Sequence, residues 1–413
     1  MNRIGLGIIL SGILGMTASA ADWTRFRGPN GTGVADDKNI PDQWTKDNIL
    51  FKTEIPGKGH SSPIVSKGKV FLQTSSADLK ERYLVCLDAI KGNIIWSKSV
   101  PGGKAKTHPK NSYASCTPAA DGDRVYAIFW DGADILLTAY DYEGNLKWKQ
   151  PLGPFVSHHG PGMSPMLVGS TVVVNVDQDG KAELMTFDAK TGKPGWSHIR
   201  DFERASYATP LLLEKTDAGP ELIVSSTGGV TSYDPKDGAI NWHFVWKFDK
   251  ARMRSVGSSV LHEGMIFAIS GDGSGDRNMI AVKAEGKGDV SRTNLVWQKK
   301  KGTAYVPSLL AKDGMIFWIN DNENVAVCVD AKTGNEIWSE RLGGGNVSAS
   351  PIIVDGKIFS VNEQGTVHVF RAAKEFEQLG KYDLKEQVYA SPAVANGRMY
   401  IRGFQNLYCI GTK

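Results

Sequence analysis

The stretch that decides the fold is residues 184–196, LMTFDAKTGKPGW, which returns as VAVCVDAKTGNEIW in residues 325–338. Further copies read LVCLDAIKGNIIW, LTAYDYEGNLKW and VTSYDPKDGAINW and end at Trp96, Trp148 and Trp242, and a weaker one ends at Trp297. The aspartate precedes the tryptophan by eight residues in four of the clear copies and by seven in the other. Such constant spacing along a chain indicates tandem structural repeats.

Each copy predicts a hairpin of two strands. An apolar strand leads to an aspartate that can accept hydrogen bonds from the N–H groups of the turn, and a glycine suited to positive φ follows. The second strand carries the tryptophan. Because the aspartate recurs wherever the turn does, we expect it to shape the turn and not to act in catalysis. The tryptophans are expected to pack between repeats and not to stack on a cofactor.

A second hairpin precedes each of these copies and opens with Ser/Thr-Pro or a similar pair. Its clearest examples are SSPIVSKGKVF from Ser61, ASPIIVDGKIF from Ala349 and ASPAVANGRMY from Ala390. The other starts lie at Cys116, Met163, Ala208, Gly257 and Val306. Four short strands per unit, with starts 41 to 55 residues apart, are typical of a propeller blade. The sequence therefore predicts an all-β, eight-bladed β-propeller with four-stranded antiparallel blades.

The eighth unit ends at Ile410, three residues before the C-terminus, and so lacks its outer strand. Residues 49–55, ILFKTEI, precede the first unit and have strand composition. We expect this N-terminal strand to complete the last blade, because closing the ring removes two exposed sheet edges. The fifth copy is weak, and the seventh has Arg371-Ala372-Ala373-Lys374 in place of the Asp-Gly turn.

The first twenty residues predict a secretory signal peptide. Arg3 precedes an apolar run that is too short to span a bilayer, and Ala18-Ser19-Ala20 forms a cleavage site. The expected organisation is a signal peptide at 1–20, an N-terminal arm at 21–47 and the propeller at 48–413. The protein is expected to be exported, either periplasmic or secreted, with no transmembrane segment. No cysteine follows the apolar run, so no lipid anchor is expected.

Charge and cysteine content narrow the functional classes. The net charge of +4 is spread along the chain without a basic block, so nucleic acid is not an expected partner. Cys86, Cys328 and Cys409 share one repeat position, and Cys116 is the fourth cysteine. Equivalent positions in different blades are held apart, so we expect buried thiols and not disulfides.

The loops between blades and those joining the second and third strands of a blade should converge at one mouth of the central channel. The candidate ligand-binding residues there are His60, Tyr113, His158, His159, Arg204, Tyr207, Arg254, Tyr305, Asn346 and Tyr389. The second set of loops adds Trp130, Asp131, Asp177, Gln178, Asp272, Asp321, Asn322 and Gln364. Cations, imidazoles and phenols suit a small anionic or polyhydroxylated ligand, and the alternative interpretation is ordinary solvated channel lining, which a propeller channel needs whatever its function.

No metal site or catalytic residue is predicted. His158 and His159 are adjacent, so their side chains should diverge, and no H-x-x-x-H or C-x-x-C partner motif occurs. The acidic loop at residues 272–278 lacks the spacing of an EF-hand, which favours a simple turn over a calcium site. The sequence also lacks a nucleophile elbow, a P-loop and C-x-x-C-H.

The repeated turns DAKTGKPGW and DAKTGNEIW, with the openings ASPIIVDGKIF and ASPAVANGRMY, resemble the pyrroloquinoline-quinone-like (PQQ-like) β-propeller repeat family. The leader at residues 22–31, DWTRFRGPNG, resembles the N-terminal motif of its exported members. The resemblance implies a quinoprotein-like propeller. Its members include quinone-dependent alcohol dehydrogenases, with an adjacent cysteine pair and a calcium constellation, and non-catalytic scaffolds such as the lipoprotein subunit of the outer-membrane β-barrel assembly machinery.

Adjacent cysteines are absent from this chain. The leading hypothesis is therefore an exported, non-catalytic scaffold that binds a protein partner or a small polar ligand at the channel mouth, with no cofactor. The alternative is an alcohol or sugar dehydrogenase that uses PQQ with calcium. A second alternative is a carbohydrate-binding propeller, in which Trp130, Tyr207 and Tyr305 could stack on sugar rings.

Overall fold

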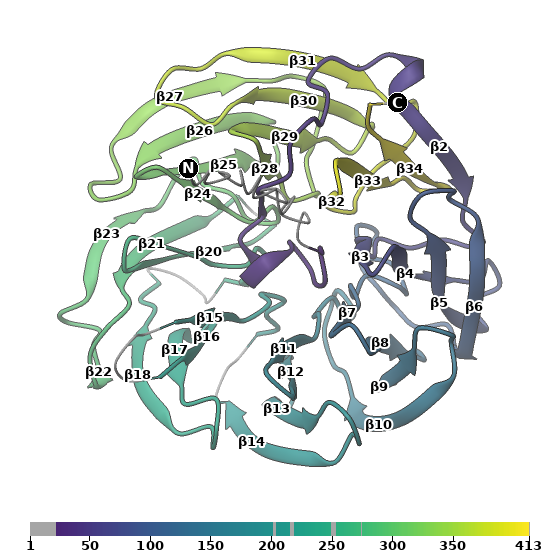
Figure 1. The fold of residues 1–413 in the computed structure, drawn as a ribbon. Coiled ribbons are helices and arrows are strands. Elements are labelled where there is room, and N and C mark those ends of the chain that lie inside the picture. Colours follow the sequence, from purple (N-terminus) through teal and green to yellow (C-terminus); the bar gives the residue numbers. More distant parts are fainter. Residues whose placement is uncertain (1–21, 201–203, 215–218, 249–252, 274, 413) are drawn as a thin grey trace, which may run out of the picture.

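The structure is a computed structural model that describes residues 22–200, 204–214, 219–248, 253–273 and 275–412. The predicted signal peptide therefore lies outside the described residues. Eight sheets surround a central channel, and the chain passes through them in order around the ring (Figure 1). The predicted eight-bladed β-propeller is confirmed.

The first four blades run from the innermost to the outermost strand. Blade 1 contains β3 (Ile64–Ser66), β4 (Lys69–Ser75), β5 (Glu81–Asp88) and β6 (Ile94–Pro101). Blade 2 contains β7 (Ala119–Ala120), β8 (Arg124–Trp130), β9 (Asp134–Asp141) and β10 (Leu146–Pro154). Blade 3 contains β11 (Met166–Val168), β12 (Thr171–Val176), β13 (Ala182–Asp188) and β14 (Pro194–Arg200). Blade 4 contains β15 (Leu211–Leu213), β16 (Glu221–Ser226), β17 (Gly229–Tyr233) and β18 (Ile240–Val245).

The next three blades follow the same plan. Blade 5 contains β19 (Val260–His262), β20 (Met265–Gly271), β21 (Arg277–Lys283) and β23 (Leu295–Lys299). Blade 6 contains β24 (Leu310–Lys312), β25 (Met315–Asn320), β26 (Val325–Asp330) and β27 (Glu336–Arg341). Blade 7 contains β28 (Ile352–Val354), β29 (Lys357–Val361), β30 (Thr366–Arg371) and β31 (Gln378–Asp383).

Blade 8 joins the two ends of the chain, as predicted. It contains β32 (Ala393–Ala395), β33 (Arg398–Arg402), β34 (Asn406–Ile410) and the N-terminal β2 (Ile49–Glu54). Strand β2 lies antiparallel to β34, with Phe51 opposite Cys409. The 3₁₀ turn η2 (Lys46–Asn48) leads into it. Unfolding one end of the chain would therefore break the ring.

The repeated tryptophans join consecutive blades. The indole N–H groups of Trp96, Trp148, Trp196, Trp297 and Trp338 each donate to a backbone carbonyl in the next blade, at Tyr142, Ala189, Pro235, Ala331 and Ala373. Trp242 differs, because its indole N–H donates to Glu221 of its own blade. Beside it, β22 (Gly288–Asp289) from the weak fifth repeat adds a parallel strand to blade 4. The expected packing role of the tryptophans is confirmed.

At four junctions between blades, the turn glycine of the following blade lies directly against the tryptophan, which is Trp96, Trp148, Trp196 or Trp297. A Cβ on Gly192, where φ is +74°, would lie 2.5 Å from the Trp148 ring, and one on Gly238 would lie 2.4 Å from Trp196. At the junction of the ring Phe51 replaces the tryptophan and covers Gly92 at the same distance of 2.5 Å. The repeat therefore needs glycine at this position for two reasons: φ is positive, and the aromatic ring leaves no room for a Cβ.

The repeated aspartates shape their turns, as predicted. Asp88 Oδ1 accepts from the N–H groups of Ile90 and Lys91 at 2.8 and 2.7 Å, and Asp188 Oδ1 accepts from that of Thr191 at 2.7 Å. Hydrogen bonds favour the carboxylate form and so lower the pKa of both groups, through the Thr191 hydroxyl and then its N–H at Asp188 and through the backbone N–H groups at Asp88. The repeated aspartates therefore have a structural role in the turns.

We expect acid to loosen these turns. The folded-state pKa of Asp188 lies below its unfolded value of about 4, so its contribution to stability is present above that pH and is lost as the pH falls through the folded-state pKa. The urea concentration at the unfolding midpoint should fall less between pH 7 and pH 3 for Asp188→Asn than for the wild type. Asp134→Asn, at an exposed strand position, is the control, and its midpoint should fall as much as that of the wild type. Equal losses in both variants would contradict the expectation.

The N-terminal arm enters the channel, which was not predicted. Trp23 exchanges backbone hydrogen bonds of 2.9 Å with Val65 in blade 1, and β1 (Val34–Ala35) adds a parallel strand to β28. The arm crosses the centre of the ring between these points as the purple segment in Figure 1, which includes the turn η1 (Pro29–Gly31). Arg25 Nη2 donates to Pro210 O at 2.6 Å, and Arg27 donates to Leu309 O. The arm thus ties blades 1, 4, 6 and 7 together.

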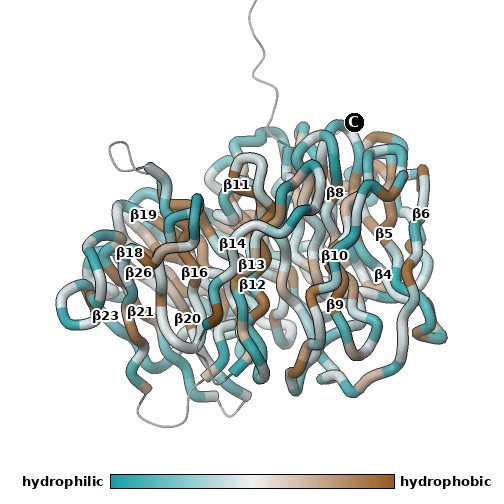
Figure 2. The backbone as a smooth tube through the Cα atoms, turned by 90° about the horizontal axis from the view of Figure 1, so that it is seen from below, coloured by the Kyte–Doolittle hydropathy of each residue, from teal (hydrophilic) through white to brown (hydrophobic). Residues whose placement is uncertain are grey.

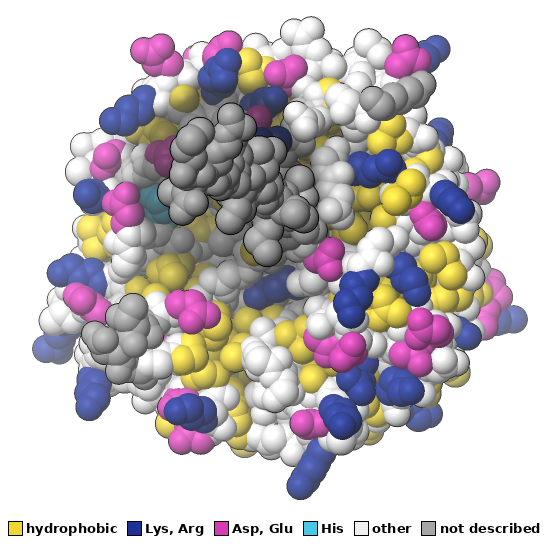
Figure 3. All heavy atoms as spheres, in the orientation of Figure 1, with side chains coloured by type: hydrophobic (Ala, Val, Ile, Leu, Met, Phe, Trp, Pro, Cys, Tyr) yellow, Lys and Arg dark blue, Asp and Glu magenta, His cyan; other side chains and the backbone are white. Residues whose placement is uncertain are grey.

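The surface and core agree with the repeat pattern. Figure 2 shows hydrophobic colours along the strands and hydrophilic colours at many of the loops. On the face shown in Figure 3, basic and acidic side chains are mixed around the rim without a large area of one sign. All four cysteines are buried free thiols, as predicted. In the described part of the chain, no helix is long and apolar enough to cross a membrane.

Candidate functional site

The Ser/Thr residues that open the blades form a ring of hydrogen bonds around the channel. The backbone N–H of each one donates to the hydroxyl of the next at 2.9–3.1 Å, through the pairs Ser62–Thr117, Thr117–Ser164, Thr209–Ser258, Ser258–Ser308, Ser308–Ser350, Ser350–Ser391 and Ser391–Ser62. No such bond is described from Ser164 to Thr209, and the buried Thr209 hydroxyl has no partner in the described structure. The ring is interrupted between blades 3 and 4.

A cavity of about 470 Å³ lies at one end of the channel, within the usual range for ligand pockets. Phe26 of the N-terminal arm lines it, so the arm bounds the cavity on its inner side. Seven predicted site residues line it: His60, His159, Tyr207, Arg254, Tyr305, Asn346 and Tyr389. From the second set of loops, Asp272, Asp321 and Asn322 line it. The predicted convergence of loops therefore brings ten of these side chains to one cavity.

Three predicted site residues lie outside the cavity lining. Tyr113 stacks on Trp130 with ring centroids 5.6 Å apart and bonds the backbone of Ala105 through its hydroxyl. His158 is exposed beside His159, with ring centroids 4.9 Å apart. Arg204 is half-buried, and its backbone carbonyl accepts from Thr227. Of these three, Tyr113 is held by packing against a neighbouring aromatic ring.

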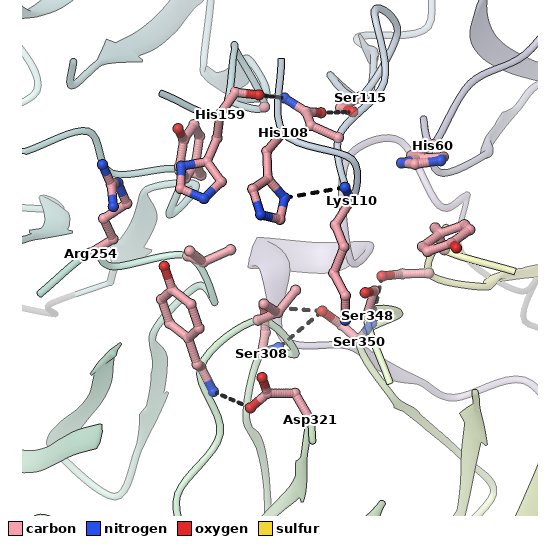
Figure 4. Close-up of a pocket in the computed structure, with 18 of the residues that line it drawn as sticks. His60, His108, Lys110, Ser115, His159, Arg254, Ser308, Asp321, Ser348 and Ser350 are labelled. Carbon is pink, nitrogen blue, oxygen red and sulfur yellow. Dashed lines mark hydrogen bonds between the residues drawn. The ribbon is translucent and has the colours of Figure 1, made fainter. Parts of the chain in front are cut away.

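One segment that lines the cavity was not predicted from the sequence. The long connection from β6 to β7 contributes His108, Lys110, Asn111 and Ser115 to the lining (Figure 4). Asn111 Nδ2 donates to the carbonyls of His159 and Pro161 at 2.6 and 3.1 Å and so fastens this connection to the next loop. Its length between blades, with several polar residues, was the signal available in the sequence.

Two basic residues of the cavity are already paired. Lys110 Nζ lies 2.8 Å from Glu363 Oε1, which also accepts from the Ser348 hydroxyl at 2.6 Å. Arg277 Nη2 lies 3.3 Å from Asp321 Oδ2. Arg277 also donates to two backbone carbonyls, at 2.8 and 3.0 Å. These contacts neutralise most of the positive charge that Lys110 and Arg277 bring to the cavity.

The Arg254 side chain has weaker described contacts than those of Lys110 and Arg277. Its side chain is 13% exposed and has one described ion pair, from Nη2 to Asp179 Oδ2 at 3.9 Å. Its Nε has no hydrogen-bond partner in the described structure, and neither has His159 Nδ1. The side chains of His159 and Arg254 lie together on one wall of the cavity (Figure 4). This wall has unused hydrogen-bonding capacity.

Burial holds the cavity's histidines neutral near pH 7. It lowers the pKa of His60 to about 4, and the pKa of His159 is lowered to about 4 by burial and then by the charge of Arg254. Burial likewise raises the pKa values of Tyr207, Tyr305 and Tyr389, so their phenols stay protonated. Among the described residues, no hydrogen bond is found between a Ser, Thr or Cys side chain and the imidazole ring of a histidine in this cavity. The arrangement supplies donors, acceptors and ring faces for binding.

The residues present do not fit PQQ with calcium. The cysteines lie one by one in separate parts of the ring, and a pair of adjacent cysteines is absent from the sequence. Within the described ranges, no group of three or more His, Cys, Asp or Glu side chains is placed to hold a metal ion. That includes His108, His158 and His159, although His108 lies 4.6 Å from His159 between ring centroids.

Comparison with known proteins identifies relatives along almost the whole ring. Outer membrane protein assembly factor BamB from Yersinia pestis is 24% identical over 324 residues, which cover 74% of this chain and 75% of that protein. The BamB structure from Moraxella catarrhalis superposes with a TM-score of 0.62 at 14% identity and covers 88% of this chain and 97% of its own. A europium-containing methanol dehydrogenase superposes with a TM-score of 0.70 at 10% identity, with coverages of 94% and 98%.

At these identities the solved structures establish a shared fold. The family described as outer membrane protein assembly factor BamB matches residues 43–154, 133–286, 286–375 and 321–412, which together span all eight blades. These matches agree with the repeat pattern of the sequence and with the ring in the structure. The chain therefore belongs to the PQQ-like repeat family of outer membrane protein assembly factor BamB.

Proposed function

We propose that this protein is an exported, non-catalytic scaffold that binds a protein partner at the channel mouth. The observation that carries the proposal is the division of labour among its residues. The repeated Asp, Gly, Trp and Ser/Thr residues are occupied by turns, blade junctions and the hydroxyl ring. The side chains that differ from blade to blade gather around one cavity. A distinctive recognition surface on a repetitive frame is what a scaffold needs.

The relatives support a protein partner over a substrate. The Yersinia pestis relative is named an outer membrane protein assembly factor, and the matching family carries the same description. By analogy, we propose that the partner belongs to the assembly of outer membrane proteins, which requires a periplasmic location. A scaffold of this kind needs no cofactor, and Phe26 of the arm contributes to the lining of the cavity.

Site-specific crosslinking tests this proposal. A photoreactive amino acid placed at His158, exposed at the mouth, should crosslink to a defined protein in cells of the native host. The matched control is Ile199, which is 67% exposed on the outer strand β14 and should give no such product. Mass spectrometry identifies the partner, and purified partner must then bind the unmodified protein. Equal crosslinking from both positions, or none from His158, would contradict a partner at the mouth.

One observation favours carbohydrate binding as a second candidate. Tyr207 and Tyr305 line the cavity and could stack on a sugar ring. Trp130 is not available for this purpose, because it is buried and stacked on Tyr113. A glycan-binding screen on the purified protein tests this candidate independently of any protein partner.

A further inference from the structure

The wall of the cavity between blades 3 and 5 combines three buried polar atoms that lack partners in the described structure. They are His159 Nδ1, Thr209 Oγ1 and Arg254 Nε, and all three residues line the cavity. Buried polar atoms are nearly always hydrogen-bonded in folded proteins, so three such exceptions at one cavity need an explanation. A ligand in the cavity is one explanation, and because the three atoms have almost no surface open to solvent, it would pair with them only after their side chains turn toward it.

These residues belong to one connected wall. The Ser157 hydroxyl bonds both the His159 N–H, at 3.2 Å, and the Tyr207 hydroxyl, at 2.7 Å. The Tyr207 N–H then donates to Ser255 O at 2.8 Å, next to Arg254 in the chain. Loops from the starts of blades 3, 4 and 5 are therefore fastened to each other around the three unpaired atoms. The wall is organised before any ligand arrives.

The break in the hydroxyl ring lies at the same place. Every other opening Ser or Thr hydroxyl in the ring accepts from the N–H of the preceding blade, whereas Thr209 Oγ1 does not. The ring thus leaves the Thr209 hydroxyl without a partner in the described structure, and Thr209 lines the same cavity as His159 and Arg254.

The charged residues around the cavity indicate which kind of ligand it would bind. On the other walls, Lys110 and Arg277 are engaged by Glu363 and Asp321. Arg254 has Asp179 at 3.9 Å, a distance that leaves its guanidinium open to a closer anion. A single negative charge complements a single under-satisfied arginine, and a planar carboxylate matches the guanidinium fork.

We propose that the wall formed by His159, Thr209 and Arg254 binds a carboxylate group. The guanidinium of Arg254 supplies the charge and two donors, and Thr209 and the neutral imidazole of His159 supply further hydrogen bonds. The carboxylate is carried either by a small organic acid or by an acidic side chain that the protein partner inserts into the mouth. The inference rests on the proposed function for the place of the site, but its test needs no partner.

Calorimetric titration of the purified protein at pH 7 tests the inference with two matched pairs of probes. Glucuronate is compared with glucose, and N-acetyl-glutamate N-methylamide is compared with its glutamine counterpart. For at least one pair, the acid should bind at least about tenfold more tightly than the neutral compound, since hydrogen bonds to charged groups carry that difference. Arg254→Gln should abolish the preference, and Thr209→Val should weaken binding of the acid about threefold.

Two controls separate binding from folding. Arg341→Gln removes an arginine on β27 that is 66% exposed and should keep the full preference. Arg254→Lys retains the charge and should keep part of the preference, which shows that the wall still forms. Thermal denaturation should give similar midpoints for all four variants.

Binding of glucuronate alone would identify a small acid as the source of the carboxylate, and binding of the glutamate derivative alone would identify a partner's side chain. No preference for either acid in the wild type, or a preference that survives in Arg254→Gln, would overturn the inference. Crosslinking from His158 to a partner combined with no acid preference would leave the proposed function standing and reject the carboxylate. A preference for an acid without a crosslinked partner would support the carboxylate site and reject the proposed protein partner.

Discussion

Gly192→Ala should lower the free energy of unfolding by about 2–5 kcal/mol, far more than the same change at a matched turn. A Cβ at position 192 meets the Trp148 ring at 2.5 Å, in addition to the strain of alanine at a φ of +74°. Left-handed strain costs about 1–2 kcal/mol, and overpacking adds about 1–3 kcal/mol. Urea denaturation followed by tryptophan fluorescence measures the difference.

Gly264→Ala is the matched control. Its φ is +73°, but nothing lies within 4 Å of the added Cβ, so only the backbone strain of about 1–2 kcal/mol should appear. Trp148→Ala in the Gly192→Ala background should cost less than the sum of the two single changes, because the clash disappears with the indole. Equal destabilisation by Gly192→Ala and Gly264→Ala would show that the tryptophan and the glycine do not form the contact that joins the blades.

Trp23→Ala should destabilise the protein by about 3–5 kcal/mol and release the arm from the channel. Trp23 is 1% exposed, and its ring lies so close to Gly28 that a Cβ there would be 2.4 Å away. Removing a fully buried tryptophan leaves a cavity that the surrounding strands cannot fill. Limited proteolysis with N-terminal sequencing should then find cleavage within residues 24–34, where the wild type is protected.

The control for this change is Ile90→Ala, at a position that is 66% exposed in a turn of blade 1. It should leave both the urea midpoint and the proteolytic pattern unchanged. An arm that remains protected in Trp23→Ala, with an unchanged midpoint, would mean that Arg25 and Arg27 hold it in the channel without the indole. Because Phe26 lines the cavity, release of the arm should also lower the affinity of the cavity for any ligand.

Much of the fold was predictable because the repeat records local geometry. An aspartate that bonds turn N–H groups and a glycine at positive φ act within one hairpin, so their spacing is visible in the sequence. The tryptophan contacts the turn of the next blade, and the repeat period places it there each time. The missing strand of the eighth repeat likewise indicated closure by residues 49–54.

The candidate site was only partly predictable. Loop positions within a blade follow from the repeat, so His159, Arg254 and Tyr305 could be assigned to one mouth of the channel. Their order in the sequence does not tell whether a side chain points inward. Tyr113 turns away to stack on Trp130, and His108 enters from a connection that no repeat describes.

The sequence by itself determined the eight blades and their turns, because these features depend on contacts that recur at a fixed separation along the chain. It also determined the closure of the ring, because the eighth repeat lacks one strand. Only the tertiary structure decided that the N-terminal arm crosses the channel and that the hydroxyl ring is broken at Thr209. The path of the arm depends on residues that are far apart in the sequence and meet once, as Arg25 does with Pro210, whereas the break at Thr209 departs from a bond that recurs at other blade junctions. Such single long-range contacts leave no repeated pattern, and they form the cavity on which the proposed function depends.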